Sequence, residues 1–251
     1  KIMEVHHHSH HPKKWKEYAT EFIMLFAAVT LGFFAENYRE GIVEQHKKEK
    51  LLHSVVDNFK LDKKEIETHR NQIKGRIKTA EHFLVLLNTD LTTVNKIDFY
   101  RTILFFAENK AMILNEKTRN DAESKGYYTT LRTTDMPAII NKYNYWYNDY
   151  KELNLGVLEI CKSFIGLNVP KIIEPDLVGY AYQLWLPENE EIKKALKGNV
   201  EQVISKENKD AIKFQIANKI VLLKAEVNTL DTLESYADKA IVTLENNLDK
   251  H

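Results

Sequence analysis

The chain has 251 residues, with 36 basic and 36 acidic side chains, 43% hydrophobic residues, and only 8 Gly and 5 Pro. This composition excludes a collagenous repeat, a disulfide scaffold and a largely disordered chain. A formal net charge of zero gives no overall basic field, so we expect no nucleic-acid partner. The single cysteine, Cys161, cannot form an internal disulfide, so cysteine usage does not indicate whether the compartment is oxidising or reducing.

Residues 1–14 form a polar head that contains five of the ten histidines, and we expect it to be disordered. Imidazole binds zinc, nickel and copper, which makes these side chains a candidate metal site. A physiological metal site holds its ligands in fixed geometry through surrounding groups, and a disordered run offers none. A solvated tail is therefore the favoured interpretation. The candidate metal ligands are His6, His7, His8, His10 and His11.

An uncharged run of 14 residues, 22–35, follows between two glutamates. As a helix it covers roughly 21 Å, which is less than the roughly 30 Å of bilayer hydrocarbon. Extending the helix over the 21 residues from Tyr18 to Tyr38 gives roughly 31 Å, enough to span. We therefore predict a transmembrane anchor over residues 15–38. The side chains expected at the membrane interfaces are Trp15, Tyr18, Glu21, Glu36, Tyr38 and Arg39.

Two other interpretations compete with a retained anchor. A buried helix of a soluble bundle would normally carry a polar stripe, but residues 22–35 contain only Thr30 as a polar side chain. A cleaved signal peptide would need small residues at its cleavage site, and Phe33 with Ala35 match that pattern poorly. The anchor is the interpretation that we favour.

Positive charge flanks the anchor on both sides and sets its expected orientation. Lys13, Lys14 and Lys16 lie close before the apolar run, and Arg39 lies close after it. The excess of positive charge directly before the run favours an N-terminus in the cytoplasm. We therefore predict an inner-membrane location with the body in the periplasm, if the source is a Gram-negative bacterium.

The body is predicted to be all-α, as a long-helix bundle that continues from the transmembrane helix. Prolines are absent from residues 13–136 and from 188 to the end, which permits long helices. Between residues 36 and 88 the apolar side chains recur at threes and fours, which predicts one amphipathic helix with a possible break near Gly75. A similar repeat over residues 216–248 predicts either a bundle helix or a coiled coil. No segment shows the alternation of a strand.

Shorter segments lie between the two long helices. Residues 97–117 predict a short helix, and Asp135 is expected to cap the next helix, with Pro137 in its first turn. Prolines and glycines mark an irregular connector, within which residues 176–186 could form a short helix. The expected division of the body is a helical bundle over 39–166, the connector over 167–187, and a C-terminal long helix over 188–251 that packs on the bundle.

No catalytic motif is present. The sequence has no glycine-rich phosphate loop, no Gly-x-Ser-x-Gly and no His-Glu-x-x-His, so we expect neither an enzyme nor a bound cofactor. Glu49, His53 and Asp57 share one helix face and could hold a metal, but exposed charged faces produce such spacing by coincidence. Cys161 has apolar sequence neighbours and is expected to be buried and inert.

An aromatic stripe lies on the helix that follows Asp135. Side chains at this spacing could stack a ligand, but they more often fill a helical core, and we expect the core role. The stripe consists of Tyr143, Trp146, Tyr147 and Tyr150.

The N-terminal region combines His10-His-Pro-Lys-Lys-Trp-Lys-Glu-Tyr18, Glu21-Phe-Ile-Met-Leu-Phe26 and Leu31-Gly-Phe-Phe-Ala-Glu-Asn37. This order resembles a family of single-pass inner-membrane proteins common in Bacteroidetes, which open with a His-rich head and a short anchor ending in Gly-Phe-x-Ala-Glu-Asn. A looser similarity lies at Ser124-Lys-Gly126 and Ile140-Asn-Lys-Tyr143. The resemblance implies an inner-membrane protein of a Gram-negative bacterium. It implies no activity and no functional residues, because the family carries only a domain-of-unknown-function label.

Three functions follow as hypotheses. The leading one is a non-enzymatic, membrane-anchored helical protein that acts as an interaction or accessory subunit in the cell envelope, in contact with the lipid bilayer and with a protein partner or itself. The alternative is an oligomeric ion channel lined by residues 21–36, with Glu21 and Glu36 as carboxylate rings at its mouths. The large apolar side chains of that segment argue against a pore. A second alternative is an envelope metal or stress sensor that uses the histidine head.

Overall fold

The computed structural model describes residues 14–131, 135–184, 190–201 and 203–249, so the candidate metal ligands of the histidine head lie outside the described residues. The predicted all-α fold class is confirmed for this part of the chain, where the one strand-like feature is a single bridge between Asn95 and Asn199. The chain forms two compact units that divide between Leu51 and Leu52. The first contains the apolar segment, and the second contains the helical bundle.

Helix α1 (Trp15–Asn88) is 74 residues long and includes the division between the two units. Its length follows from the absence of proline and from apolar side chains at helical spacing. The break considered near Gly75 does not occur, and the helix continues through this residue. A Cβ atom at Gly75 would meet nothing within 4 Å, so the glycine lies on an open face and makes no close approach to another element.

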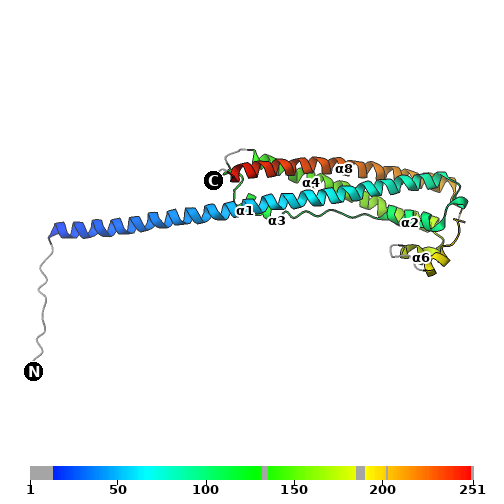
Figure 1. The fold of residues 1–251 in the computed structure, drawn as a ribbon, viewed down its shortest axis with the longest axis horizontal. Helices are drawn as coiled ribbons and strands as arrows, with labels where there is room; N and C mark the ends of the chain where they lie inside the picture. The colour runs from blue at the N-terminus through cyan, green and yellow to red at the C-terminus, as the bar shows by residue number, and fades with distance from the viewer. Residues whose placement is uncertain (1–13, 132–134, 185–189, 202, 250–251) are drawn as a thin grey trace, which may run out of the picture. The chain divides into compact units, whose positions relative to one another are not determined.

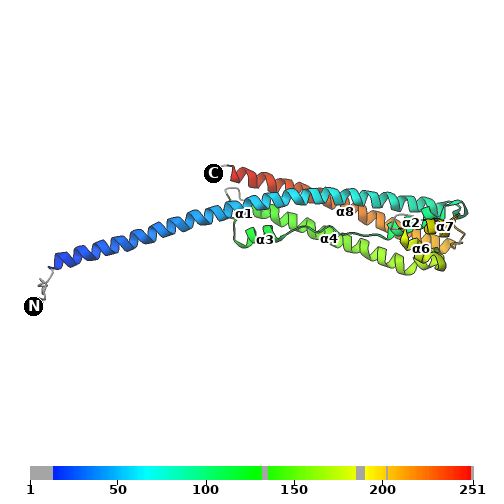
Figure 2. The same ribbon diagram turned by 60° about the horizontal axis from the view of Figure 1, so that its bottom comes forward.

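Three long helices form the main part of the second unit: α1 from Leu52 onward, α4 (Met136–Leu167) and α8 (Lys206–Leu248). They lie side by side along most of their length, as Figures 1 and 2 both show. Lys60 of α1 contacts Glu245 at 2.8 Å, and Arg70 contacts Asp231 at 3.0 Å. As the number rises on α1 it falls on α8, so these two helices are antiparallel.

Buried positions on each long helix alternate at intervals of three and four residues. This spacing keeps one seam of a helix facing its neighbours over many turns. On α1 the seam is Leu52, Val55, Phe59, Asp62, Ile66, His69, Ile73, Arg76, Ala80, Phe83 and Leu87. On α4 it is Met136, Ile140, Tyr143, Tyr147, Tyr150, Asn154, Val157, Cys161 and Phe164. On α8 it is Ile212, Ile216, Lys219, Leu223, Glu226, Leu230, Leu233, Ala237, Ala240, Leu244 and Asn247.

The prediction of a helix over residues 97–117 is wrong in its second half. Helix α2 (Lys96–Ala107) ends early, and residues 108–116 run as an extended strap to the short helix α3 (Lys117–Ser124). Met112 and Leu114 of the strap are buried, while Ile113 between them is 83% exposed. Successive side chains of an extended chain point to opposite sides, so every second residue can be buried. This explains why Met112 and Leu114 are both buried although they are only two positions apart.

Small helices gather with α2 at one end of the bundle (Figure 2). They are η1 (Leu91–Thr93), α5 (Val169–Ile172), η2 (Pro175–Leu177), α6 (Val178–Gln183) and α7 (Glu190–Ala195). The predicted connector therefore contains short helices. Edge-to-face aromatic pairs fill the core here, with the rings of Phe106 and Phe164 4.7 Å apart and those of Phe83 and Phe106 5.5 Å apart.

The starts of α4 and α8 differ in how they are capped. Asp135 precedes α4, and a proline lies in the first turn as predicted, but the Asp135 side chain makes no capping hydrogen bond. That part of the prediction is wrong, because the Asp135 backbone is already helical and not in the extended conformation that a capping side chain requires. Ser205 does cap α8, since its side chain accepts a hydrogen bond from the backbone N–H of Asn208 at 3.2 Å.

Candidate functional site

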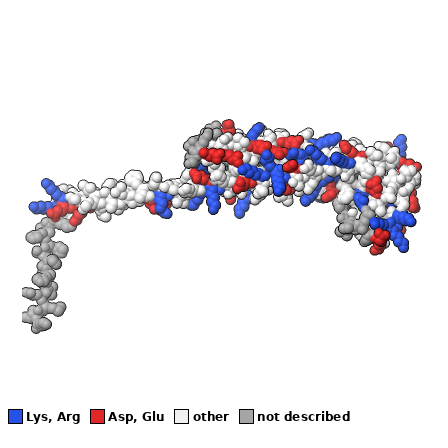
Figure 3. Space-filling view, viewed as in Figure 1, with Lys and Arg blue, Asp and Glu red and all other residues white. Residues whose placement is uncertain are grey.

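The apolar segment of α1 exposes large side chains on every side of the helix. Among the described helices, α1 alone is long and apolar enough to cross a membrane by length and composition. Figure 3 shows the segment as an uncharged stretch with charged side chains at both ends. More than 60% of each of the following side chains is exposed: Phe22, Ile23, Met24, Leu25, Phe26, Val29, Leu31, Phe33 and Phe34. Such a helix needs an apolar environment around its whole circumference.

The side chains predicted for the membrane interfaces lie at the two ends of this segment. Trp15, Tyr18 and Tyr38 are exposed, so their rings are available to a headgroup region. The guanidinium of Arg39 binds the carboxylate of Glu36 with two hydrogen bonds, at 3.0 Å from Nε and 2.5 Å from Nη2. The charges of this pair offset each other, which lowers the free energy of placing a carboxylate close to lipid.

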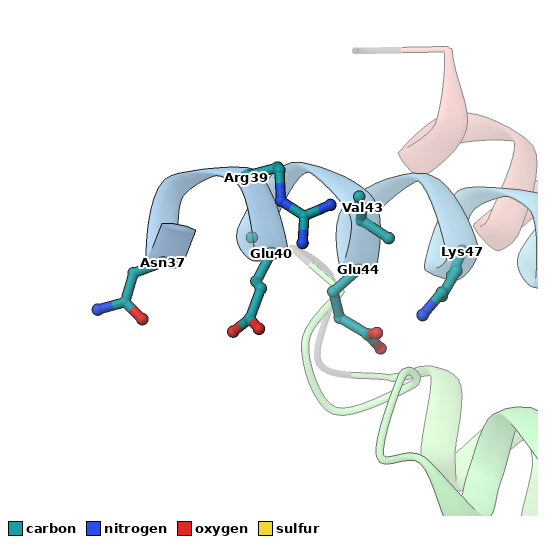
Figure 4. A pocket seen from close by; sticks show the side chains of 7 residues that line it. Asn37, Arg39, Glu40, Val43, Glu44 and Lys47 are labelled. Atoms are coloured by element: carbon teal, nitrogen blue, oxygen red, sulfur yellow. The ribbon is translucent and has the colours of Figure 1, made fainter. Parts of the chain in front are cut away.

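A shallow groove follows directly after the apolar segment (Figure 4). All of its lining residues come from one stretch of α1, so it is a groove along a single helix with acidic and basic side chains. Figure 4 shows the carboxylates of Glu40 and Glu44 on one side of the helix, with Lys47 beyond them. The lining residues are Asn37, Arg39, Glu40, Gly41, Val43, Glu44 and Lys47. Among the residues that the structure describes, only α1 lines the groove, so no second element supplies a reactive group there.

The bundle contains a second candidate site, a column of polar side chains in its buried seams. At one end, Arg119 of α3 donates to the carboxylate of Asp62 on α1 and, at 2.8 Å, to Asn58. The hydroxyl of Tyr143 on α4 also donates to Asp62, at 2.9 Å. The Arg119 guanidinium lies over the rings of Phe59 and Tyr143 at 5.3 and 4.9 Å. Burial raises the pKa of Asp62, and Arg119 opposes that shift.

The next layer of the column joins α1 and α4 to the strap. The backbone N–H groups of Met112 and Leu114 donate to the hydroxyls of Tyr150 and Tyr147, at 2.7 and 3.0 Å. The Tyr150 hydroxyl also lies 2.8 Å from Nε2 of His69. The core role predicted for the aromatic stripe is confirmed for its three tyrosines, which are buried, whereas the Trp146 ring is half-buried.

A third layer brings together four polar side chains, one each from α1, the strap, α4 and α8. Arg76 of α1 donates to Asn109 Oδ1 and to the carbonyl of residue 110, both at 3.3 Å. Asn154 of α4 donates to Asn109 and, at 3.1 Å, to Oε1 of Glu226 on α8. Glu226 is fully buried, and its Oε2 has no hydrogen-bond partner. Burial therefore raises the pKa of Glu226 to about 7, although the hydrogen bond from Asn154 opposes the shift.

The last layer is a lysine and the cysteine. Lys219 of α8 donates to the carbonyl oxygen of Phe106 and, at 3.1 Å, to that of Glu108. Its Nζ also lies 3.1 Å from Sγ of Cys161. Cys161 is buried as predicted. Burial lowers the pKa of Lys219, because a charged ammonium loses its hydration there.

The polar column has a structural explanation in the strap. An extended segment that is buried carries backbone N–H and C=O groups that no helix pairs, and each needs a partner. Four side chains of the long helices supply those partners: Tyr147, Tyr150, Arg76 and Lys219. The tyrosines and Cys161 were expected in the core, but the charged and amide members of the column were not predicted, because such side chains seldom occupy the apolar seam of a helix. The interval of seven residues between Asp62, His69 and Arg76 is the signal that could have found it.

The described residues contain no group of three or more His, Cys, Asp or Glu side chains placed to hold a metal. Glu49 instead accepts a hydrogen bond from Gln45 at 2.7 Å and lies 3.8 Å from His46. Comparison with known proteins adds no assignment: no family model matches the chain, and no curated protein and no solved structure matches it either.

Proposed function

We propose that the chain is a non-enzymatic, single-pass inner-membrane protein whose helical body acts as an interaction or accessory subunit in the cell envelope. The contrast between the two units carries this proposal. Residues 22–34 expose apolar side chains all around the helix, whereas the bundle buries its apolar seam residues, such as Leu223 and Leu230, within the chain. Lipid acyl chains would cover the exposed segment and remove its unfavourable contact with water.

The flanks of the segment support the anchor and its orientation. Exposed aromatic rings at both ends suit the aromatic belts of a bilayer, and 24 residues from Trp15 to Tyr38 cover roughly 36 Å as a helix. Lys14 and Lys16 favour a cytoplasmic N-terminus. In a Gram-negative bacterium, the source that the family resemblance implies, the bundle would then lie in the periplasm.

The buried polar column supports a non-enzymatic role. Its groups are enclosed by three helices, and most of them are already hydrogen-bonded to one another or to the strap. A catalytic site needs such groups within reach of a substrate. The regular seams also match a coiled-coil arrangement of α1, α4 and α8 within one chain, which suits a rigid interaction domain.

The channel alternative requires carboxylate rings at the mouths of a pore. The bidentate pair with Arg39 places a positive charge beside Glu36, which would neutralise one of the two rings. The exposed phenylalanines between the mouths would leave little polar lining. Both observations favour the anchor.

Membrane extraction tests the anchor. The full chain should stay with the membrane pellet through carbonate and high-salt washing and should dissolve only in detergent. A matched variant that begins at Glu44 should be released into the soluble fraction. Release of the full chain by the carbonate wash would contradict the proposal.

Topology is tested separately by adding protease to spheroplasts. A periplasmic body should be degraded from its C-terminal side, while an epitope placed before Trp15 stays protected. Protection of the C-terminal side with cleavage of the epitope would place the body in the cytoplasm and would leave the anchor itself unaffected.

A further inference from the structure

Lys219 and Cys161 lie inside the bundle with their reactive atoms in contact. Nζ and Sγ are 3.1 Å apart, and the two side chains are 1% and 2% exposed. Cys161 belongs to α4 and Lys219 to α8, so the contact joins two long helices. Fully buried lysines normally have a charged partner. The polar atoms that contact Nζ here are Sγ of Cys161 and the carbonyl oxygens of Phe106 and Glu108, and no carboxylate is among them.

The three contacts hold the nitrogen directly against the sulfur. Nζ donates to the carbonyl oxygens of Phe106 and Glu108 and to Sγ of Cys161. Burial lowers the pKa of Lys219 and so favours the neutral amine, although the contact with Cys161 opposes this shift. A neutral amine is a nucleophile, whereas an ammonium ion is not.

We propose that Cys161 and Lys219 form a reversible covalent N–O–S bridge, with dioxygen as the oxidant. The S–H bond and one N–H bond break. One oxygen atom of dioxygen forms the link between Sγ and Nζ, and the other leaves as water with the two released hydrogens. Sulfur and nitrogen each give up two electrons, and dioxygen takes up four.

The bridge can be reversed by a thiol reductant. Two dithiol molecules supply four electrons and four hydrogens, which regenerate the thiol and the amine and release the bridging oxygen as water. The bridge is thus a reversible oxidised form of Cys161. It replaces the inert role that the burial of this side chain predicts. Dioxygen is small and apolar, so it can reach a buried site from which larger oxidants are excluded.

The bridge would change the stability of the bundle. It joins two positions separated by 58 residues, and the loop between them includes the small helices α5, η2, α6 and α7. A cross-link of this length restricts the unfolded chain and stabilises the folded one. The inference does not depend on the proposed membrane anchor, since it concerns only residues of the bundle.

The test is a peptide map of the full chain purified in detergent. One sample is kept anaerobic with dithiothreitol, and the other is saturated with dioxygen and then freed of it. The oxidised sample should contain a cross-linked peptide pair whose mass is the sum of the Cys161 and Lys219 peptides plus one oxygen and minus two hydrogens. Dithiothreitol should convert the pair back to the separate peptides, and the oxidised sample should melt at a higher temperature.

Variants locate the bond. Lys219→Met keeps an unbranched side chain without the nitrogen, and Cys161→Ser removes the sulfur, so both should lose the cross-linked pair. Lys224→Arg changes an exposed lysine on the same helix and should retain it. Recovery of Cys161 as a free thiol after oxidation, or as a sulfinic acid with Lys219 unmodified, would overturn the proposal. That result needs only the parent chain, so a variant that fails to fold does not weaken the test.

Discussion

Tyr150 connects His69 to the strap through a single hydroxyl group. The oxygen lies 2.8 Å from Nε2 of His69 on α1 and accepts a hydrogen bond from the backbone N–H of Met112 at 2.7 Å. Burial lowers the pKa of His69 to about 4, so the ring is neutral and Nε2 can accept the hydroxyl proton. One side chain of α4 therefore satisfies a buried acceptor and a buried donor from two other segments.

Replacing Tyr150 with phenylalanine tests this role. The substitution Tyr150→Phe keeps the ring but leaves the N–H of Met112 and Nε2 of His69 without their partner, so we expect a loss of about 1–3 kcal/mol in the free energy of unfolding. The control Tyr145→Phe removes a hydroxyl from a side chain that is 57% exposed, and it should change stability by less than about 0.5 kcal/mol. Urea denaturation in mild detergent measures both. Equal effects of the two variants would show that the strap does not depend on the Tyr150 hydroxyl.

The ion pair between Arg119 and Asp62 gives a second prediction. Arg119→Met leaves a buried carboxylate without its cation, so we expect a loss of about 3–5 kcal/mol. Lys117→Met on the exposed side of the same short helix is the matched control, with an expected change within about 0.5 kcal/mol. The double variant Asp62→Leu/Arg119→Met removes both charges and should recover part of the loss. A double variant that is less stable than Arg119→Met alone would contradict this explanation.

The sequence predicted the long helices well, because their signals are local. Proline-free stretches and apolar side chains at threes and fours indicate the helices of the bundle without knowledge of any distant contact. The seam of α8 was harder to recognise. Its apolar residues alone drift around Leu230 and Leu233, but Lys219 and Glu226 occupy the positions that complete a regular alternation of threes and fours.

The strap could not be predicted from local sequence. Residues 108–116 contain no proline or glycine to end a helix. Their conformation depends on partners far along the chain: Tyr150 lies 38 positions from Met112, and Lys219 lies 111 positions from Glu108. Helical propensity contains no information about such contacts, which form only when α4 and α8 are in place.

Closure of the apolar seam within one chain gives a third prediction. Leu223 and Leu230 of α8 are fully buried by the chain itself. Leu223→Ala and Leu230→Ala should each destabilise the bundle by about 2–5 kcal/mol, while Val221→Ala, at a site that is 64% exposed, should have a much smaller effect. The melting temperature should not depend on protein concentration, because helices of the same chain bury these seam residues. A melting temperature that rises steeply with concentration would show instead that the stability depends on association.

Two buried groups with opposite pKa shifts give the fourth prediction. The pKa of Glu226 is raised to about 7 from 4.5, so the folded chain binds this proton more tightly than the unfolded chain. Its contribution to stability is present below about pH 4.5 and is lost as the pH rises to about 7. The pKa of His69 is lowered to about 4 from 6.5, so the unfolded chain binds this proton more tightly, and stability rises between about pH 4 and pH 6.5. The effects of Glu226 and His69 on the pH dependence of stability therefore oppose each other over most of the range in which they titrate.

When one of the two groups is removed, the free energy of unfolding should therefore follow the pH dependence that the other group sets. Each group alone changes this free energy by about 1.4 kcal/mol per pH unit. The free energy of unfolding of Glu226→Gln, relative to the parent chain, should rise by up to about 3 kcal/mol between pH 4.5 and pH 7, since the variant has no carboxyl group to ionise in the core. For His69→Gln the same difference should fall by a similar amount between pH 4 and pH 6.5, because the variant lacks the neutral histidine that favours folding as the pH rises. Glu152→Gln, at an exposed position on α4, serves as the control and should follow the parent at every pH. Urea denaturation of the four chains at half-unit pH steps measures these differences, and a constant offset between Glu226→Gln and the parent across the window would show that Glu226 does not titrate in the folded bundle.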